Sequence, residues 1–517
     1  MNDGLSLEEQ ARLAMELEVY APEPKRAAAI KPMDMKVVEQ GAGVLNVLAG
    51  TAAEQGANQC TDLANARRLV AHYGDSMLFV EGIGWHTWGP PWRSDPLGAR
   101  QIAHELGSIV ADEADSMAAW VAKAPSIEEM EQREDARKAR WQWAKSSESS
   151  ARITAALQEA EALMRCKAED MDADAMLLGV RNGVVELDTG RFRDYRQADR
   201  ITKTCGVDYD QSAGCDQWLS FVDTVMGGDV GLVEFMHCLA GYLLTGQRGE
   251  HVLPIFYGSG ANGKTTLVGA LQHVLGDYAG TAPPGLLIQR SGNEHPTGLA
   301  SLHGRRLVVS SETGEGGRLN EEQAKMLTGG DRIAARRMRQ DFYEFTPTHQ
   351  LVLLTNHKPR VGGTDEGIWR RLRLVPFEVT IPPEQRDAHL PDKLRAEGSG
   401  ILNWCMHGLQ KYRANGLPMP AAIRDATAQY RGDSDQVGGF LDECTAPAPG
   451  RVAAGDLYRS YVAWCDGSGE RAMAQRQFGV RLAERGMHPM KGTAGARYWQ
   501  GLRIVDSAAE YRRARGG

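Results

Sequence analysis

Residues 251–276 read HVLPIFYGSGANGKTTLVGALQHVLG, and this stretch decides the fold. The apolar run at 252–257 predicts a buried strand. Residues 258–265 then fit the pattern G-x-x-x-x-G-K-[ST] at every fixed position. Apolar residues from Leu267 to Leu275 recur at helical spacing, and Gly276 ends that helix. A phosphate-binding loop between a strand and a helix predicts an α/β fold that binds a nucleoside triphosphate.

The chemistry of phosphate binding explains this order of residues. Glycines let backbone N–H groups turn inward around a phosphate, and the helix N-terminus adds partial positive charge. Lys264 is expected to bridge the β- and γ-phosphates of ATP, and the Thr265 hydroxyl to bind Mg²⁺. The predicted nucleotide-binding residues are Gly258, Ser259, Gly260, Ala261, Asn262, Gly263, Lys264, Thr265 and Thr266.

Two further apolar runs end in polar residues that a nucleotide hydrolase needs. Residues 306–312, RLVVSSE, end at Glu312, whose carboxylate is predicted to manage Mg²⁺ and water. Residues 350–356, QLVLLTN, end at Asn356, whose amide can hold the attacking water or touch the γ-phosphate. The alternatives are a surface glutamate at a strand edge and an asparagine that caps a turn.

Arginines follow in the segment WRRLRLVPF at 369–377. Arg370 and Arg371 suit an arginine finger that reaches a nucleotide across a subunit boundary. Ordinary surface salt bridges are the alternative for this pair.

A cationic segment lies between Glu312 and Asn356. Its residues 325–349 read KMLTGGDRIAARRMRQDFYEFTPTH, with arginines at 332, 336, 337 and 339 and no acid from 332 to 339. Because arginine contacts to phosphates are independent of sequence, this predicted hairpin suits a polyanion. The alternative is that these arginines form a solvated face or a strip of salt bridges between subunits.

The region before the loop predicts helices and small hairpins. Turn formers and tryptophans at 85, 88 and 92 predict a hairpin, read as a local aromatic core in preference to a base-stacking platform. Residues 101–168 and about 215–245 predict helices. Asp170, Asp172 and Asp174 do not fit the pattern of a calcium-binding loop, and they predict an acidic turn. A second hairpin is predicted around Arg181-Asn182-Gly183.

The composition limits which classes of partner and which cellular compartment the sequence favours. The 517 residues include 59 Lys and Arg against 67 Asp and Glu, which excludes a general basic coat but not a local basic patch. The eight cysteines form no C-x-x-C pair and suggest reduced, cytosolic thiols. No secretory signal and no 18-residue apolar run are found, so no membrane association is expected.

Five motifs in order resemble the phage/plasmid primase–helicase family, the superfamily 3 helicases related to poxvirus-type primase–helicases. They are RNGVVELDTG, GSGANGKTT, RLVVSSETGEGGRLNE, KMLTGGDRIAARRM and LVLLTNHKPRVGGTDEGIWRRLRLVPF. The resemblance implies an AAA+-like P-loop ATPase core that works as a ring, usually a hexamer. It implies translocation on single-stranded DNA, typically 3′ to 5′, alongside replication proteins such as a primase or polymerase. A cytoplasmic location in a bacterial host, with phage or prophage origin, follows from the same resemblance.

The resemblance also implies residue roles. Lys264 and Thr265 match Walker A, Glu312 the Walker B acid, Asn356 the sensor of motif C, and Arg370 or Arg371 the arginine finger. Lys325, Arg336, Arg337 and Arg339 match the DNA-contacting motif and hairpin.

Two departures from the family pattern stand out. Ser311 precedes Glu312 where many relatives have a second acid, so Glu312 serves alone or Glu315 helps. Neither a zinc-binding set nor a catalytic metal pair is found before residue 200, so primase activity does not follow from the sequence.

The expected fold class is therefore α/β, with a helical N-terminal region, the ATPase core and a winged-helix-like C-terminal domain. The domain boundaries expected are 1–60, 61–215, 216–415 with a helical lead-in at 216–248, and 420–517. Lys491, Arg497, Tyr498 and Trp499 are expected on the wing, or else its aromatics form the domain's own core.

The function expected is that of an ATP-dependent DNA helicase of phage or prophage replication. The alternative is a nucleotide-switched DNA-binding or origin-loading module that does not translocate. A small-molecule kinase explains neither the cationic hairpin nor the arginines at 370 and 371.

Overall fold

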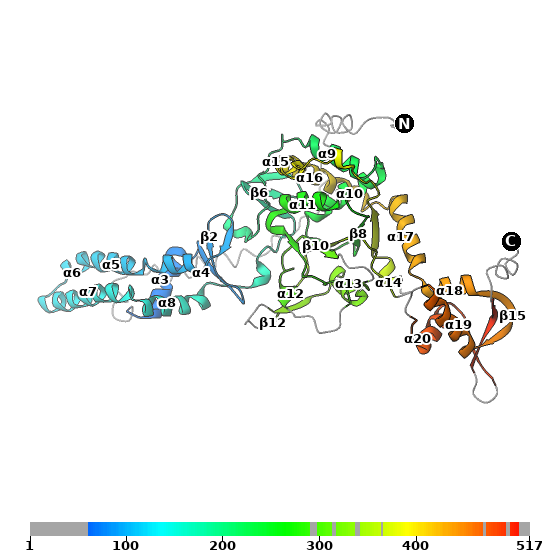
Figure 1. The fold of residues 1–517 in the computed structure, drawn as a ribbon. Helices are drawn as coiled ribbons and strands as arrows, with labels where there is room; N and C mark the ends of the chain where they lie inside the picture. The colour runs from blue at the N-terminus through cyan, green and yellow to red at the C-terminus, as the bar shows by residue number, and fades with distance from the viewer. Residues whose placement is uncertain are drawn as a thin grey trace, which may run out of the picture. The chain divides into compact units, whose positions relative to one another are not determined.

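The computed structural model describes residues 60–289, 297–312, 317–336, 342–362, 366–468, 472–492 and 497–505. The chain divides into two compact units (Figure 1). The first combines Met1–His72 with His104–Ala156, and the second combines Tyr73–Ala103 with Leu157–Gly517.

The first unit is helical, which confirms the helices predicted in 101–168. Its helices are α3 (Asp62–Tyr73), α5 (Leu106–Ser116), α6 (Ala118–Ala122), α7 (Ile127–Ser147) and the start of α8 (Ser150–Leu163). The charge-rich helix α7 begins after Ser126, whose hydroxyl accepts the Glu129 N–H at 3.2 Å. Within this helix Arg133 pairs with Glu129, four residues earlier, at 2.5 Å.

A buried polar network holds these helices together. Glu113 accepts hydrogen bonds from Arg68 at 2.7 Å and from Arg140 at 2.6 Å. The Asn65 amide donates to the Ser147 hydroxyl at 2.9 Å, and both residues are fully buried. Each buried charge therefore has a partner, as burial in a low dielectric requires.

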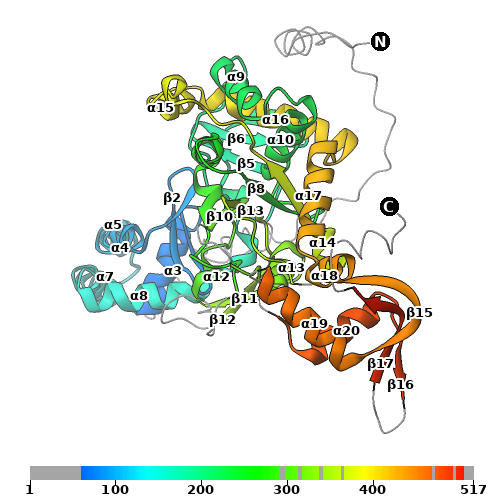
Figure 2. The same ribbon diagram turned by 45° about the vertical axis from the view of Figure 1, so that its right-hand side comes forward.

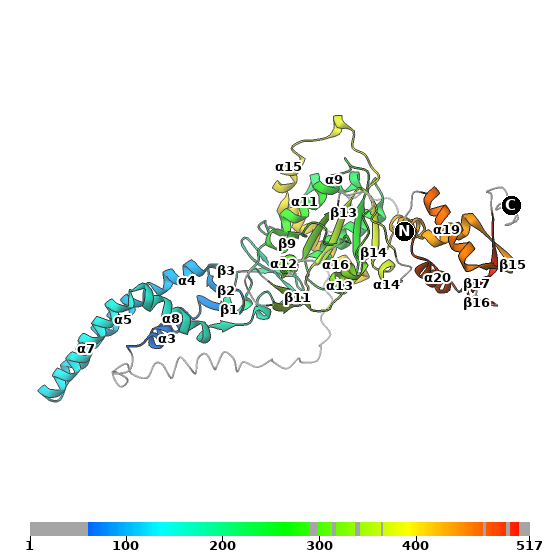
Figure 3. The same cartoon turned by 60° about the horizontal axis from the view of Figure 1, so that its bottom comes forward.

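The centre of the second unit is a five-stranded sheet in the order β14-β8-β13-β10-β9, with every pairing parallel. Figure 3 shows β9, β13 and β14 of this sheet. Its strands are β8 (Leu253–Tyr257), β9 (Ala279–Thr281), β10 (Leu307–Glu312), β13 (Gln350–Thr355) and β14 (Leu372–Pro376). The three apolar runs that predicted strands are confirmed. The chain is thus a mixed α/β protein with a parallel sheet.

Helices cover both faces of this sheet. Phe256 and Val309 belong to a core formed with helices of one face, whereas their neighbours Ile255 and Val308 belong to a second core. This alternation is the two-residue period of a strand buried on both sides. The first core contains α9 (Asp216–Val225), α10 (Val230–Leu243), α11 (Lys264–Leu275), α15 (Leu390–Ala396) and α16 (Gly398–Asn415). The second contains α13 (Glu321–Thr328), α14 (Glu366–Trp369) and Tyr430 of α17 (Ala421–Asp433), and α12 (Thr297–Ala300) packs against it.

Two small sheets precede the core, as predicted. The first has the order β3-β2-β1-β4 and consists of β1 (Met77–Val80), β2 (Gly84–Trp88), β3 (Trp92–Ser94) and β4 (Arg165–Cys166). Helix α4 (Pro96–Ala103) follows β3 in the chain. Trp85 and Trp92 are buried, and the rings of Trp88 and Trp92 meet edge to face at 5.3 Å. The tryptophans therefore form a local core, in line with the favoured reading.

The second small sheet contains β5 (Leu177–Val180), β6 (Gly183–Glu186) and β7 (Arg191–Arg193). Val180 pairs with Gly183, so Arg181 and Asn182 form the turn of the predicted hairpin. Asp172, predicted to lie in an acidic turn, also makes tertiary contacts. It has a φ of 52°, and its carboxylate accepts the Thr202 N–H at 2.7 Å and the Lys203 ammonium at 3.0 Å.

The C-terminal part has a core of its own around Phe440, Tyr461 and Phe478. Figure 2 shows the helices and strands of this part in orange and red. Its elements are α18 (Gln436–Cys444), β15 (Thr445–Ala453), α19 (Ala454–Gly467), α20 (Gln475–Glu484), β16 (Pro489–Lys491) and β17 (Arg497–Ile504). The strands pair antiparallel in the order β15-β17-β16.

Candidate functional site

The phosphate loop, Glu312 and Asn356 lie at one edge of the parallel sheet. In the register, Glu312 pairs with Thr355, Thr355 with Tyr257, and Tyr257 with Pro376. These residues form one row across four strands, at the carboxyl end of each. The strand that carries Asn356 lies between the strand of the phosphate loop and the strand of Glu312. This edge is where parallel α/β sheets bind ligands.

The loop has the backbone that its glycines predicted. Gly260, Ala261 and Gly263 have φ values of 109°, 50° and 80°. Ala261 is a strained exception because it carries a Cβ in the left-handed region. Its carbonyl accepts the Ile381 N–H at 2.9 Å, which holds that conformation. A Cβ added at Gly258 would lie 2.3 Å from the Phe377 carbonyl oxygen, so only glycine fits there.

Lys264 and Asn262 close the loop from inside. The buried Lys264 ammonium donates to the Gly258 carbonyl at 2.7 Å and to the Asn262 side-chain oxygen at 3.0 Å. The Asn262 amide in turn donates to the Phe377 carbonyl at 3.0 Å, which ties the loop to the segment after β14. Burial lowers the pKa of Lys264. An ammonium that is removed from water and close to the loop backbone fits a phosphate partner.

The remaining loop-side groups are accessible. Thr265 is exposed on the first turn of α11, and Thr266 beside it is half-buried. Asn356 is exposed just beyond β13, where the Thr355 hydroxyl accepts the His357 N–H at 3.1 Å and shapes the turn. For Glu312 the structure describes the backbone position in β10 only.

Arg370 and Arg371 lie at the opposite edge of the sheet from the loop of the same chain. They precede β14, and Leu372 at its start pairs with Leu253 at the start of β8. Four residues of strand, about 13 Å, separate that row from the row of Tyr257. Arg371 is half-buried and donates to the Gly367 carbonyl at 2.7 Å, whereas Arg370 is exposed.

The cationic segment forms the predicted hairpin. Strands β11 (Ile333–Arg336) and β12 (Phe342–Phe345) pair antiparallel, and Arg336 stacks at 5.1 Å over the exposed ring of Phe342. Arg337 and Arg339 lie outside the described residues. Lys325 is half-buried on α13, the helix that leads into the hairpin.

Arg332 does not follow the prediction that the arginines of this segment are available for a polyanion. It pairs with Glu344 at 3.3 Å and with Glu169 at 3.8 Å, so one of the four arginines already has carboxylate partners. Both acids lie outside the stretch from 332 to 339, and only the hairpin and the chain's tertiary packing bring them close.

The C-terminal hairpin holds part of the expected wing. Lys491 and Arg497 are exposed and pair with each other in the register of β16 and β17. Arg451 stacks at 4.6 Å over Tyr498. The placement of Trp499 on a DNA-facing wing is wrong, because its side chain is only 5% exposed and belongs to the core of this domain.

Sequence reasoning missed Arg248. This half-buried residue follows α10, and its guanidinium donates to the carbonyls of Leu327 and Gly329 at 2.8 and 2.9 Å and also to that of His349. It therefore fixes the base of the β11–β12 hairpin. No local pattern marks it, since all three acceptors are distant backbone atoms.

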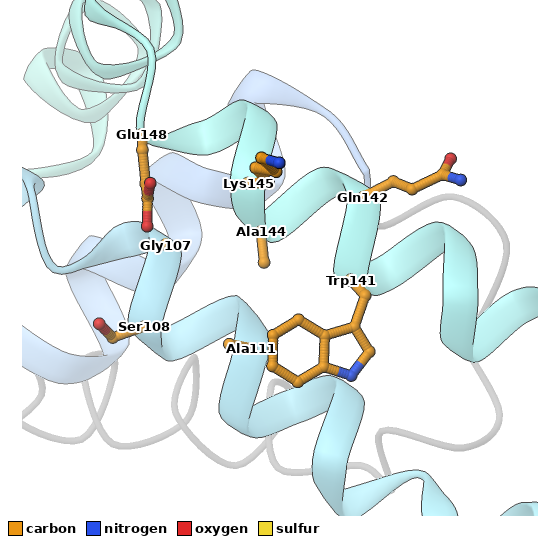
Figure 4. A pocket seen from close by; sticks show the side chains of 8 residues that line it. All are labelled: Gly107, Ser108, Ala111, Trp141, Gln142, Ala144, Lys145 and Glu148. Carbon is orange, nitrogen blue, oxygen red and sulfur yellow. The ribbon is translucent and has the colours of Figure 1, made fainter.

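Sequence reasoning also missed a cavity of about 490 Å³ in the first unit. It lies between α5 and α7, and the indole of Trp141 extends over Ala111 (Figure 4). Trp141 is 43% exposed, and Gly107, Ser108 and Ala144 form much of the remaining wall.

In the part of the chain that the structure describes, no group of three or more His, Cys, Asp or Glu side chains gathers as around a metal ion. No described helix is long and apolar enough to cross a lipid bilayer.

Comparisons with known proteins connect both parts of this architecture to replication proteins. Residues 66–227 match the family model described as "D5 N terminal like", and residues 256–371 match the one described as "Family of unknown function (DUF5906)". The protein named "Putative helicase L207/L206" of Acanthamoeba polyphaga mimivirus is 27% identical over 57% of this chain and 33% of its own length. The protein named "Putative primase C962R" of African swine fever virus is 25% identical over 63% of this chain and 37% of its own.

The chain thus spans about a third of the length of these curated relatives. Among solved structures, the C-terminal region of NrS-1 aligns with a TM-score of 0.38 at 10% identity, covering 57% of this chain and 78% of that one. The predicted resemblance is confirmed: the two family models and the relatives named as helicases and primases support a phage or viral primase–helicase family for this chain.

Proposed function

We propose that this protein is an ATP-dependent DNA helicase of phage or viral replication, with an AAA+-like core that assembles into a ring. The observation that carries the proposal is the single row of Tyr257, Glu312 and Thr355, which brings the phosphate loop, the acid and Asn356 to one edge. The relatives named as helicases support the same class of function.

In this proposal the loop at 258–266 binds ATP. Lys264 exchanges its contacts with Gly258 and Asn262 for the β- and γ-phosphates, while the N-terminus of α11 faces the phosphates. Thr265 and Glu312 would hold Mg²⁺, which neutralises phosphate charge when it is bound. Asn356 orients the attacking water, and Glu312 accepts a proton from it.

The arginines favour hydrolysis between subunits. Because Arg370 and Arg371 lie at the far edge of their own sheet, they suit the site of a neighbouring protomer. Lys325 and the hairpin with Arg336, Arg337 and Arg339 would contact the single strand, and movement of the hairpin during hydrolysis would translocate it. A winged-helix C-terminal domain, with helix, strand, two helices and two strands in order, would add a second DNA contact.

ATP hydrolysis measured with and without single-stranded DNA tests this proposal, together with strand separation on a forked duplex. We expect DNA to stimulate hydrolysis, separation to require ATP, and Lys264→Ala to lose both. Negative-stain images with an ATP analogue and single-stranded DNA should show rings. Absence of stimulation and of separation contradicts the proposal.

The same experiments discriminate the second candidate, a nucleotide-switched loading module. Such a module assembles on DNA with ATP but separates no strands at any enzyme concentration. Its assembly is also lost in Lys264→Ala, whereas a motor still assembles when nucleotide binding partly survives.

A further inference from the structure

A second cavity, of about 620 Å³, lies in the second unit away from the phosphate loop. Its walls come from the turn before β3, the β5–β6 turn, residues 202–206 and the end of α11. A cavity of this volume is within the range of small-ligand sites.

The cavity is rigidly built. Trp92 donates its backbone N–H to the Ile201 carbonyl at 3.0 Å and its indole N–H to the Gln197 carbonyl at 2.9 Å. The Gly206 N–H donates to the Val274 carbonyl at 2.9 Å, and the Asp277 N–H to the Thr204 carbonyl at 2.9 Å. Backbone hydrogen bonds therefore connect the lining segment 202–206 to the end of α11.

Two guanidiniums line this cavity. Arg93 and Arg181 are both exposed, and among the described residues neither has a carboxylate within salt-bridge distance. Burial and the charge of Arg181 both lower the pKa of the nearby His273. Two arginines that line one hollow, in a chain with an excess of acids, suit a phosphate group.

The lining also has an acidic part. Asp277 is exposed among the lining residues, its carboxylate accepts the Thr204 N–H at 3.2 Å, and the carbonyl end of α11 adds partial negative charge. A bare phosphate would be repelled from this part of the lining. A ligand with phosphate at one end and hydrogen-bond donors at the other, such as a sugar hydroxyl or a base amino group, would satisfy both the basic and the acidic residues.

We propose that this cavity binds a nucleotide, with its phosphate on Arg93 and Arg181 and its base or sugar donors toward Asp277. The same chemistry is offered by a free nucleotide and by one nucleotide of a single strand. This site is separate from the phosphate loop, and the proposal does not depend on ATP hydrolysis.

The test uses full-length protein with Lys264→Ala and no Mg²⁺, so that the phosphate loop contributes little. Calorimetry measures AMP and inorganic phosphate, and fluorescence anisotropy measures a labelled dT20. Arg93→Gln with Arg181→Gln is compared with Arg191→Gln, an exposed arginine of β7 outside the cavity. Equal thermal unfolding midpoints establish that the variants fold.

We expect the double variant to weaken binding at least about tenfold while Arg191→Gln leaves it unchanged. Loss of AMP binding identifies a free nucleotide, and loss of dT20 binding alone identifies a strand. The proposal is overturned if neither ligand binds, if the double variant binds both as Arg191→Gln does, or if inorganic phosphate binds as tightly as AMP.

Discussion

At the scale of single residues, the structure separates the two candidates for the arginine finger. The Arg371 guanidinium donates a hydrogen bond to the Gly367 carbonyl. Its Nε is buried without a hydrogen-bond partner among the described residues. Arg370 is exposed beside it. A finger needs a side chain that can extend to another subunit, so Arg370 is the better candidate and Arg371 a structural residue.

We therefore predict that Arg370→Ala lowers the ATPase rate at least about a hundredfold, because a finger contributes about 10³–10⁵ in rate. Arg371→Ala should mainly lower the thermal unfolding midpoint. Mixing Arg370→Ala with Lys264→Ala subunits should restore hydrolysis at about a quarter of the interfaces, since each variant supplies what the other lacks. A mixture as inactive as its components would show that the finger does not act between subunits.

A second residue-scale prediction concerns pH. His349 is fully buried, both its ring nitrogens lack a hydrogen-bond partner among the described residues, and burial together with Arg248 lowers its pKa to about 3. In the unfolded chain the His349 ring binds a proton near pH 6.5, whereas in the folded chain it binds one only near pH 3. The stabilisation from neutral His349 is thus complete above pH 6.5 and is lost as pH falls from 6.5 toward 3.

Urea unfolding between pH 7.5 and 4.5 measures this effect. His349→Leu should reduce the fall in the free energy of unfolding by up to about 1.4 kcal/mol per pH unit below 6.5. The exposed His389→Gln is the control and should follow the wild-type curve. Equal slopes for His349→Leu and the wild type would mean that His349 is protonated in the folded state.

At the scale of elements, the segment between α10 and β8 supports the hairpin proposed to contact DNA. Arg248 binds the carbonyls of Leu327 and Gly329, and the His251 ring lies 3.2 Å from the Thr328 carbonyl. The strand of the phosphate loop begins at Leu253, directly after these contacts. The chain therefore links the two functional elements through a few partly buried hydrogen bonds.

Arg248→Ala should lower the free energy of unfolding by about 1–3 kcal/mol, because three carbonyls lose a half-buried charged donor. It should also reduce stimulation of hydrolysis by single-stranded DNA more than basal hydrolysis. Arg248→Lys should rescue little, since one ammonium cannot span three acceptors. The exposed Arg191→Ala is the matched control. Unchanged stimulation in a folded Arg248→Ala variant would contradict this link.

Local patterns were sufficient to predict the elements but not their neighbours. Apolar runs that end in Glu312 and Asn356 predict strands, and parallel pairing then places their ends at one edge. The order that puts β13 between β8 and β10 depends on contacts between distant segments, which no local period encodes. Trp499 was misplaced for a related reason: a strand alternates its faces, and the sequence does not say which face the core covers.

At the scale of the whole molecule, the acidic net charge conceals an uneven distribution. The chain has a formal charge of −8, yet basic residues outnumber acidic ones in residues 436–505. Arg451, Lys491 and Arg497 belong to the strands of this C-terminal part. Its apolar core starts at Val437, whereas Tyr430 still belongs to the core beside the parallel sheet.

A chain that ends at Asp433 should therefore keep its folded sheet and a basal ATPase rate within about twofold of the full chain, since no described residue of the C-terminal core belongs to the two cores of the sheet. Its affinity for single-stranded DNA should fall, with a shallower dependence on salt, because each lost phosphate contact removes about 0.9 or less from the logarithmic slope. Anisotropy with dT20 at 50 to 200 mM salt measures both quantities. A shortened chain with the full salt slope would mean that the C-terminal strands do not contact DNA, and loss of ATP binding would mean that this part stabilises the nucleotide site.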